Sequence, residues 1–285
     1  MWKIYLSKKK NIIHISKLLN LLKTDSIFKE FYYFDLLPST QEFAFKIIKR
    51  KNIIFPSVII CNIQSNGKGR KGTKWASPKG GIWISVILES NLKIEKLFIF
   101  VMISAICICE TIEKETHLKT DLKWPNDVFV NGKKIAGILL DVETNFDYKN
   151  NNIIIGMGVN TNNDIDSTVL EIKKNDSSFY QITTLKKELN DKVSNMVFLS
   201  TLLNNLDFYL LNINSNSINY ENVFKIYKDR IMNSKNKINY SFKNNDNITF
   251  DGELIDLNND GTLLVRDISQ KKTLKISSAN NVELT

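Results

Sequence analysis

Glycines and basic residues gather between positions 67 and 81 of the 285-residue chain. The glycines are Gly67, Gly69, Gly72, Gly80 and Gly81, and the cations among them include Lys68, Arg70, Lys71 and Lys74. Glycine lets a backbone approach a ligand and expose its N–H groups, and the cations offer charge to a phosphate or a carboxylate. The segment has neither the P-loop pattern nor a GxGxxG fingerprint that opens a helix. Taken alone, it fits an anion-binding loop and a solvated hairpin loop equally well.

A second group of residues with chemical potential is Lys123-Trp124-Pro125-Asn126-Asp127. We expect Lys123 at a strand end, constrained by the bulky Trp124 and by Pro125, which would hold the chain extended. A lysine fixed in this way can neutralise charge on a phosphoryl group under attack. Asn126 and Asp127 either bind a magnesium-phosphate or form an Asx turn, and the turn is the favoured interpretation.

Composition narrows the class of protein. The formal net charge is +9, but lysine is spread along the whole chain beside abundant asparagine, which indicates compositional drift rather than a nucleic-acid surface. No run reaches the roughly 18 apolar residues of a membrane span, so we expect no membrane association. The three cysteines and two histidines are too scattered for a metal cluster or a His-based triad. Free buried thiols favour a reducing compartment, so we expect a cytoplasmic protein, with an organelle as the alternative.

The elements that must position these groups can be read from hydrophobic patterning. Ser39 and Glu42 have the spacing of a capping box and predict a helix that runs to about Arg50. Asn131-Gly132 is a strong hairpin signal. Other expected elements are strands over 57–64, 82–89, 127–130, 134–142 and 152–159 and a long apolar helix over 94–115. Gly156 and Gly158 would leave room on the last strand for a ligand or a neighbouring backbone.

Outside this part of the chain the pattern of hydrophobic and turn residues changes. Residues 183–230 predict two or three helices, and short strands around Asn258-Asn259-Asp260-Gly261 predict a small β-barrel. Residues 1–37 form an apolar and basic extension with weak helical periodicity. The predicted domains are therefore an N-terminal extension over 1–37, a catalytic domain over 38–235 and a small C-terminal domain over 236–285.

Three motifs together resemble those of biotin–protein ligases. The residues that carry the resemblance are Gln64 with 67–78 (GKGRKGTKWASP), similar to GRGRxGRxWxSP; 123–127 (KWPND) with 134–139 (KIAGIL); and 156–160 (GMGVN), similar to GIGxN. The resemblance covers roughly residues 38–160. It implies an α+β fold in which helices flank a mixed β-sheet, as in class II aminoacyl-tRNA synthetases, followed by an SH3-like barrel. Lys68 departs from the family pattern, which commonly has arginine there.

The resemblance also implies an activity. Biotin and ATP, with Mg²⁺, would give biotinyl-adenylate and pyrophosphate, and the adenylate would then acylate a lysine of a biotin carboxyl carrier domain, as in acetyl-CoA carboxylase. Residues 1–37 are too few for a winged-helix module, so we expect no operator binding, and a homodimer is one possible assembly. The alternatives are a lipoate or octanoate ligase or transferase of the same fold, and a non-catalytic basic binding protein with a degenerate ligase domain.

Residue roles follow from the resemblance position by position. Lys123 and Arg70 would be catalytic. The biotin-binding set would be Ser39, Thr40, Gln41, Gln64, Lys68, Gly69, Arg70, Lys123, Gly137 and Ile138, the last two at the ureido end. The ATP- and adenylate-binding set would be Lys68, Arg70, Trp75, Asn126 and Asn160, with no resident metal. Ser39 has a second interpretation, because it also fits a helix N-cap.

Overall fold

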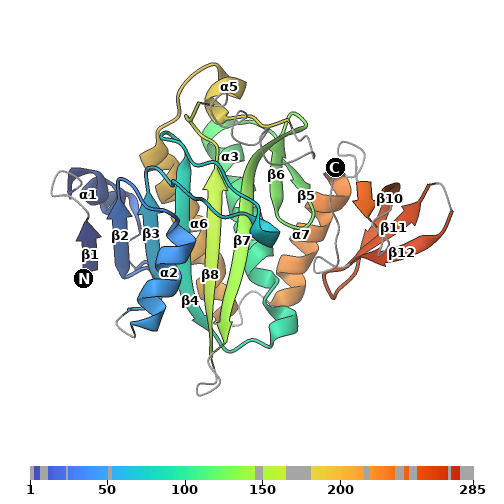
Figure 1. Ribbon diagram of the computed structural model, residues 1–285, viewed down its shortest axis with the longest axis horizontal. Helices are drawn as coiled ribbons and strands as arrows, with labels where there is room; N and C mark the ends of the chain where they lie inside the picture. Colours follow the sequence, from blue (N-terminus) through green and yellow to red (C-terminus); the bar gives the residue numbers. More distant parts are fainter. Residues whose placement is uncertain are drawn as a thin grey trace.

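The computed structural model describes residues 3–6, 12–23, 25–50, 53–144, 150–164, 181–214, 219–234, 241–243, 249–268 and 271–276. The main strands are β1 (Lys3–Leu6), β2 (Glu30–Phe34), β3 (Ser57–Cys61), β4 (Ile82–Ser90), β5 (Asp121–Lys123), β6 (Asp127–Val130), β7 (Lys133–Thr144) and β8 (Asn151–Val159). They form one eight-stranded sheet of order β1-β2-β3-β4-β8-β7-β6-β5 (Figure 1). β1, β2 and β3 are parallel neighbours and the remaining pairs are antiparallel, so the sheet is mixed, as predicted.

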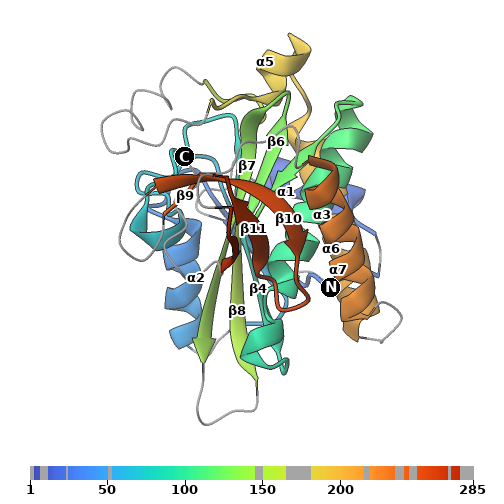
Figure 2. The ribbon, with the colours of Figure 1, turned by 90° about the vertical axis from the view of Figure 1, so that its right-hand side faces the viewer.

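Helices cover both faces of this sheet. They are α1 (Ile12–Leu21), α2 (Thr40–Lys49), α3 (Ile99–Thr116), α5 (Leu185–Leu189), α6 (Asn195–Asn214) and α7 (Tyr220–Ser234), with short 3₁₀ turns at Arg70–Gly72 and Ile94–Lys96. Side chains of α1, α3, α6 and α7 share one large apolar core with the sheet, whereas α2 packs on the opposite face in a smaller core (Figure 2). The flanking helices confirm the predicted α+β architecture.

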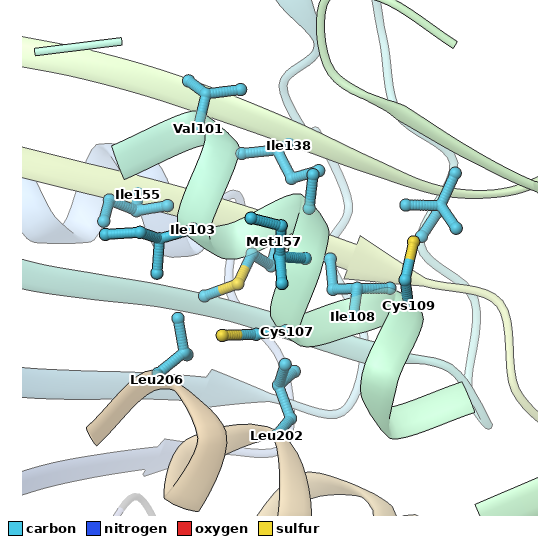
Figure 3. Packing of buried hydrophobic residues seen from close by; sticks show 14 of the residues in the cluster. Val101, Ile103, Cys107, Ile108, Cys109, Ile138, Ile155, Met157, Leu202 and Leu206 are labelled. Carbon is cyan, nitrogen blue, oxygen red and sulfur yellow. The ribbon is translucent and has the colours of Figure 1, made fainter. Parts of the chain in front are cut away.

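The helix α3 is the centre of the large core. Its apolar side chains meet Ile138 of β7 and Met157 of β8 on one side and Leu202 and Leu206 of α6 on the other (Figure 3). Because apolar neighbours surround α3, it is buried nearly all round and has no clear polar face, which its sequence anticipates. The same arrangement buries Cys107 and Cys109 as free thiols, as predicted.

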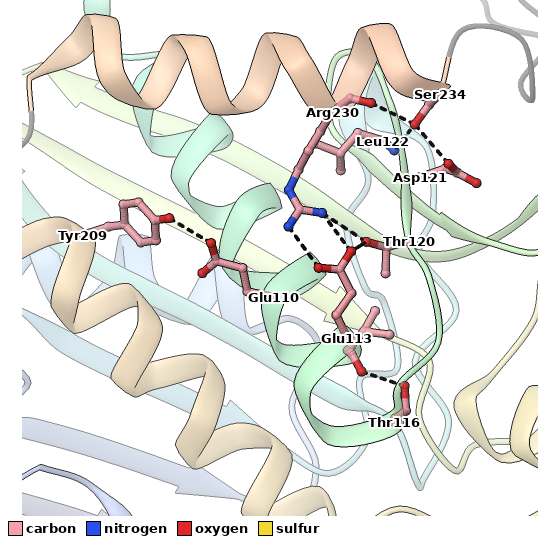
Figure 4. Close-up of polar contacts among 10 residues, drawn as sticks. Glu110, Glu113, Thr116, Thr120, Asp121, Leu122, Tyr209, Arg230 and Ser234 are labelled. Carbon is pink, nitrogen blue, oxygen red and sulfur yellow. Dashed lines mark hydrogen bonds and ion pairs between the residues drawn. The ribbon is translucent and has the colours of Figure 1, made fainter.

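Polar contacts fasten the outer helices to α3. Glu113 of α3 pairs with Arg230 of α7 at 2.8 Å, and the Tyr209 hydroxyl of α6 donates to Glu110 at 2.9 Å (Figure 4). The helix α6 is long and apolar enough, by length and composition alone, to cross a membrane. It packs along α3, however, and just over half of its apolar window is buried, which is the behaviour of a core helix.

Two turns decide how the central strands are joined. The β6–β7 hairpin turns at Asn131 and Gly132, both with positive φ (51° and 71°), which confirms the predicted hairpin. The short strands β5 and β6 also form a hairpin, and Trp124-Pro125-Asn126 is its turn, with a cis bond before Pro125. The expectation that Pro125 holds an extended chain is wrong, since the chain reverses there.

The two ends of the chain differ in how far they match the expected domains. The sequence predicts an extension over residues 1–37, and within that range β1 and β2 are strands of the main sheet. At the other end, β9 (Ser241–Lys243), β10 (Thr249–Leu257), β11 (Leu263–Asp267) and β12 (Thr273–Ile276) form a second, four-stranded antiparallel sheet. This small sheet is consistent with the SH3-like C-terminal domain implied by the resemblance.

Candidate functional site

The N-terminus of α2 presents polar side chains to the sheet. Ser39 is the N-cap, with extended backbone, and its hydroxyl accepts a hydrogen bond from the Glu42 N–H at 3.4 Å. The next two residues, Thr40 and Gln41, belong to the first helical turn and are almost fully buried. A capping role for Ser39 is therefore established by the geometry, and its contact with a ligand stays a prediction.

Gln64 joins α2 to the glycine-rich segment. Its side-chain oxygen accepts from the Thr40 backbone N–H at 2.8 Å and lies 3.1 Å from the Thr40 hydroxyl. Its amide nitrogen donates to the Ser77 hydroxyl at 2.7 Å. The strand expected over 57–64 ends at Cys61, but Gln64 still forms isolated bridges with Leu37 and Ser77. These contacts fix both ends of the Gln64 amide.

Two polar residues that sequence reasoning missed, the buried Ser85 and the half-buried Asp141, extend this network. Ser85 of β4 lies 2.8 Å from the Thr40 hydroxyl and 2.9 Å from the Gln41 side-chain oxygen. Asp141 of β7 accepts from the Gln41 amide nitrogen at 2.9 Å. Each interrupts an otherwise apolar strand, IWISVILE and KIAGILLDV, and a polar residue within such a strand is the signal that could have found them.

The glycine-rich segment is an ordered hairpin over the sheet. The Gly69 N–H donates to the Thr73 carbonyl at 2.8 Å, and the Trp75 N–H donates to the Gly67 carbonyl at 2.9 Å. A Cβ at Gly67 would lie 2.3 Å from the Trp75 carbonyl oxygen, so only glycine allows this approach. Lys68 leaves the hairpin sideways and pairs with Glu42 of α2 at 2.9 Å.

Arg70 links this hairpin to the β5–β6 turn. Its guanidinium Nη1 donates to the Asn126 side-chain oxygen at 3.1 Å, and the Asn126 amide nitrogen donates to the Ile138 carbonyl at 2.6 Å. Burial lowers the pKa of Arg70, and the nearby Asp127 carboxylate opposes that effect. The residue nevertheless stays a cation at neutral pH, because arginine does not deprotonate in proteins. The structure thus brings Arg70 and Asn126 together.

Lys123 is a second cation in the same region. It is only 2% exposed, and burial lowers its pKa to about 8, while Asp127 favours its charge and Lys134 disfavours it. Lys134 pairs with Asp127 at 2.6 Å. Arg70, Lys123 and Lys134 therefore share one carboxylate, which leaves an excess of positive charge that suits a phosphate-bearing ligand.

Trp75 covers a glycine pair in the centre of the sheet. Gly137 of β7 and Gly158 of β8 are cross-strand neighbours, and a Cβ on either would meet the Trp75 indole at 2.9 Å or 2.5 Å. The buried indole Nε1 has no hydrogen-bond partner, and neither does Oδ1 of Asp127. Since buried polar groups in folded proteins are usually paired, two such atoms beside the cations indicate a site made for a ligand.

Two predicted residues lie apart from this cluster. The Ile138 side chain packs against α3 on the other face of the sheet, so only its backbone faces the Arg70–Asn126 contact (Figure 3). Asn160 follows β8; its N–H donates to the Ile135 carbonyl at 2.8 Å, and its side-chain oxygen accepts from Asn163 at 3.0 Å. Gly156 lies under Gln41, which takes the space that its missing side chain leaves.

Comparison with known proteins bears on this arrangement. Residues 33–160 match the model of the biotin/lipoate A/B protein ligase family. The chain is 34% identical over 142 residues to the bifunctional ligase/repressor BirA of Bacillus subtilis, covering 50% of this chain and 43% of that protein. It is 29% identical over 108 residues to the biotin–[acetyl-CoA-carboxylase] ligase of Mycobacterium tuberculosis, covering 36% and 38%. The chain thus matches less than half the length of these curated relatives.

A solved structure extends the likeness to most of the fold. The biotin protein ligase of Aquifex aeolicus in complex with biotin and ATP has a TM-score of 0.67 and covers 88% of this chain and 96% of that chain. The sequence identity is 23%, so this likeness concerns the fold. It includes more of the chain than the family match does.

Proposed function

We propose that this chain, whose residues 33–160 match the model of the biotin/lipoate A/B protein ligase family, is an ATP-dependent biotin–protein ligase. The observation that carries the proposal is the contact between Arg70 and Asn126, 3.1 Å apart. It joins the glycine-rich hairpin to the lysine-bearing turn, two motifs that are far apart in the sequence. Together they bring the half-buried Arg70 and the buried Lys123 to one place, and a reaction between two anions requires such cations.

The first half-reaction fits this electrostatic arrangement. A carboxylate oxygen of biotin attacks the α-phosphorus of ATP, the bond from that phosphorus to the bridging oxygen breaks, and pyrophosphate leaves. Both reactants are negative, so preorganised cations lower the barrier by offsetting their repulsion. Arg70 and Lys123 are held from two directions for this role, while the Asp127 carboxylate offsets the charge of Lys134 in their ion pair.

The second half-reaction uses the same intermediate. The ε-amine of an acceptor lysine attacks the acyl carbon, a C–N bond forms, AMP leaves, and the amine gives up a proton. An acyl-adenylate hydrolyses readily, so a cover over it preserves the intermediate. We propose that the hairpin of residues 64–77 supplies that cover, with Arg70 on the phosphate.

Mg²⁺ would accompany ATP as a substrate complex. Asp127 offers a suitable ligand atom, because its Oδ1 is buried and has no hydrogen-bond partner while its Oδ2 pairs with Lys134. A carboxylate oxygen is a ligand that Mg²⁺ prefers, and that ion is commonly held by one or two carboxylates together with substrate phosphates. Asp127 would therefore orient the metal-bound phosphates.

The acceptor and compartment extend the proposal. The name of the Mycobacterium tuberculosis relative suggests a carboxyl carrier domain of acetyl-CoA carboxylase as the acceptor. The free cysteines Cys61, Cys107 and Cys109 are buried, which supports a reducing compartment, and we propose the cytoplasm.

Incubation with ATP, Mg²⁺, biotin and a purified carrier domain tests the function. We expect biotin-dependent release of pyrophosphate and a mass increase on one carrier lysine. Lipoate and octanoate in place of biotin, in the same assay, test the alternative substrates. A chain that releases pyrophosphate with neither biotin nor a lipoyl-type acid, under conditions where a known ligase is active, contradicts the proposal.

A further inference from the structure

Asp141 of β7 fixes the orientation of the buried side-chain amide of Gln41. Its carboxylate Oδ2 accepts a hydrogen bond from Nε2 of Gln41 at 2.9 Å, and the same nitrogen donates to the Ile154 carbonyl at 3.2 Å. A carbonyl oxygen can only accept, and so can an ionised carboxylate. The Gln41 amide therefore has one orientation, with its NH₂ group toward Asp141 and Ile154 and its oxygen toward Ser85.

The orientation of the Gln41 amide determines which hydrogen bonds its neighbours Ser85 and Thr40 can make. Ser85 has one hydroxyl proton and lies 2.9 Å from the Gln41 oxygen and 2.8 Å from the Thr40 hydroxyl. The Gln41 oxygen cannot donate, so the Ser85 proton is committed to it. Thr40 then receives no proton from Ser85.

The other neighbour of Thr40 is equally fixed. The Gln64 oxygen accepts from the Thr40 backbone N–H at 2.8 Å, so it too can only accept from the Thr40 hydroxyl, 3.1 Å away. The Gln64 oxygen accepts, and the Ser85 proton is donated to Gln41, so neither neighbour donates a proton to the Thr40 hydroxyl. The lone pairs of that hydroxyl therefore stay available to a ligand. The network presents an acceptor at Thr40, which suits an N–H donor.

We propose that Asp141 is a positioning residue that orients Gln41 and thereby makes Thr40 an acceptor for a ureido N–H of biotin. The inference rests on the proposed function. Without the Asp141 carboxylate, only the longer bond to Ile154 would hold the amide, and a reversed amide would let Ser85 give its proton to Thr40. Asp141 therefore acts through Gln41 and Ser85 and does not itself contact the substrate.

Replacement of Asp141 tests the proposal. We expect Asp141→Leu to raise the KM for biotin, and its Kd by calorimetry, about tenfold, because one charge-assisted hydrogen bond is lost. The KM for ATP should stay within twofold. Asp141→Asn should restore biotin affinity, since its side-chain oxygen still accepts from Gln41. The matched control is Glu143→Leu, which removes a carboxylate two residues along the same strand and should leave both constants unchanged.

A second pair of variants separates this role from a structural one. If Asp141 acts through Gln41, then adding Asp141→Leu to Gln41→Leu should weaken biotin binding no further. Should Asp141→Leu fail to fold, Asp141→Ala takes its place in both tests. Equal biotin affinity in wild type and the apolar variants, or an equal loss of affinity for ATP, overturns the inference. A wild-type chain that neither binds biotin nor releases pyrophosphate with it would instead overturn the proposed function.

Discussion

The guanidinium of Arg70 donates a hydrogen bond to the Asn126 side chain at 3.1 Å, across 56 positions of sequence. This contact holds the tip of the glycine-rich hairpin against the β5–β6 turn, so a ligand in the site would lie beneath a cover closed by one residue. Arg70 also carries the charge that would hold the phosphate of an adenylate. We therefore expect this single side chain to combine closure of the hairpin with retention of the intermediate.

Replacement of Arg70 by glycine should remove both the contact that closes the hairpin and the charge that retains the adenylate. We expect Arg70→Gly to release biotinyl-adenylate into solution and to increase labelling of bystander lysines, because both the closing contact and the phosphate charge are lost. The free adenylate can be measured by chromatography after rapid filtration, and bystander labelling by blotting with serum albumin present. The control is Arg50→Gly, at the exposed C-terminus of α2. Equal release by wild type and Arg70→Gly would show that the hairpin does not retain the intermediate.

Much of this arrangement can be predicted from the sequence where local chemistry decides it. The N-cap at Ser39, the Asn131-Gly132 turn and the apolar helix that became α3 are each specified by neighbouring residues. Such signals depend on a few adjacent side chains and survive in any context. The motif at Lys123 likewise predicts a site before the fold is known.

The features that sequence reasoning missed depend on distant partners. Strand β1 is only four residues long and exists because it pairs with β2, so its own pattern gives little warning. Pro125 reads as an extended residue, yet the pairing of β5 with β6 places it in a turn. Asp141 contacts Gln41 only because α2 brings Gln41 over β7; the strand pattern marks Asp141 as an exceptional polar residue but does not encode its partner.

The charge of Lys123 should limit activity at high pH. Burial lowers its pKa to about 8, so the free protein loses this cation as the pH rises through that value. We expect kcat/KM for pyrophosphate release, which reports the free protein, to fall above about pH 8. The corresponding fall in kcat, its alkaline limb, should occur at a higher pH, since a bound phosphate favours the charged form of Lys123. Lys123→Arg should lose the limb, because arginine stays charged. An unchanged limb in that variant would assign it to another group.

The contact of Trp75 with Gly158 should appear as an energetic coupling. A methyl group at Gly158 would meet the indole nitrogen at 2.5 Å, so Gly158→Ala must displace the ring. We expect a loss of about 1 to 3 kcal/mol in the free energy of unfolding, which is the usual cost of overpacking a core. In a Trp75→Ala background the same change should cost much less. Denaturant titration of the four proteins in this cycle measures the coupling, and additive losses would contradict the contact.

Tyr227 should contribute to positioning the β5–β6 turn from the opposite side. Its hydroxyl, buried in α7, donates to the Pro125 carbonyl at 2.6 Å, between Trp124 and Asn126. Trp124 is itself held by a hydrogen bond of 3.0 Å from its indole to the Gly261 carbonyl, in the turn between β10 and β11. The turn that carries Lys123 and Asn126 is therefore fastened by two elements from later in the chain.

Removal of the hydroxyl in Tyr227→Phe should loosen that turn while leaving the ring in place. We expect a loss of about 1 kcal/mol in stability from the lost hydrogen bond, together with a rise in the KM for ATP and an unchanged KM for biotin. Unfolding and steady-state pyrophosphate assays on the same preparation measure both. Tyr209→Phe is the matched control, because it removes a hydroxyl bonded to Glu110 at 2.9 Å on the far side of the core. Tyr209→Phe should lower stability to a similar extent with no change in either KM. The same change in the KM for ATP in both variants would show that Tyr227 only stabilises the fold and does not position the turn.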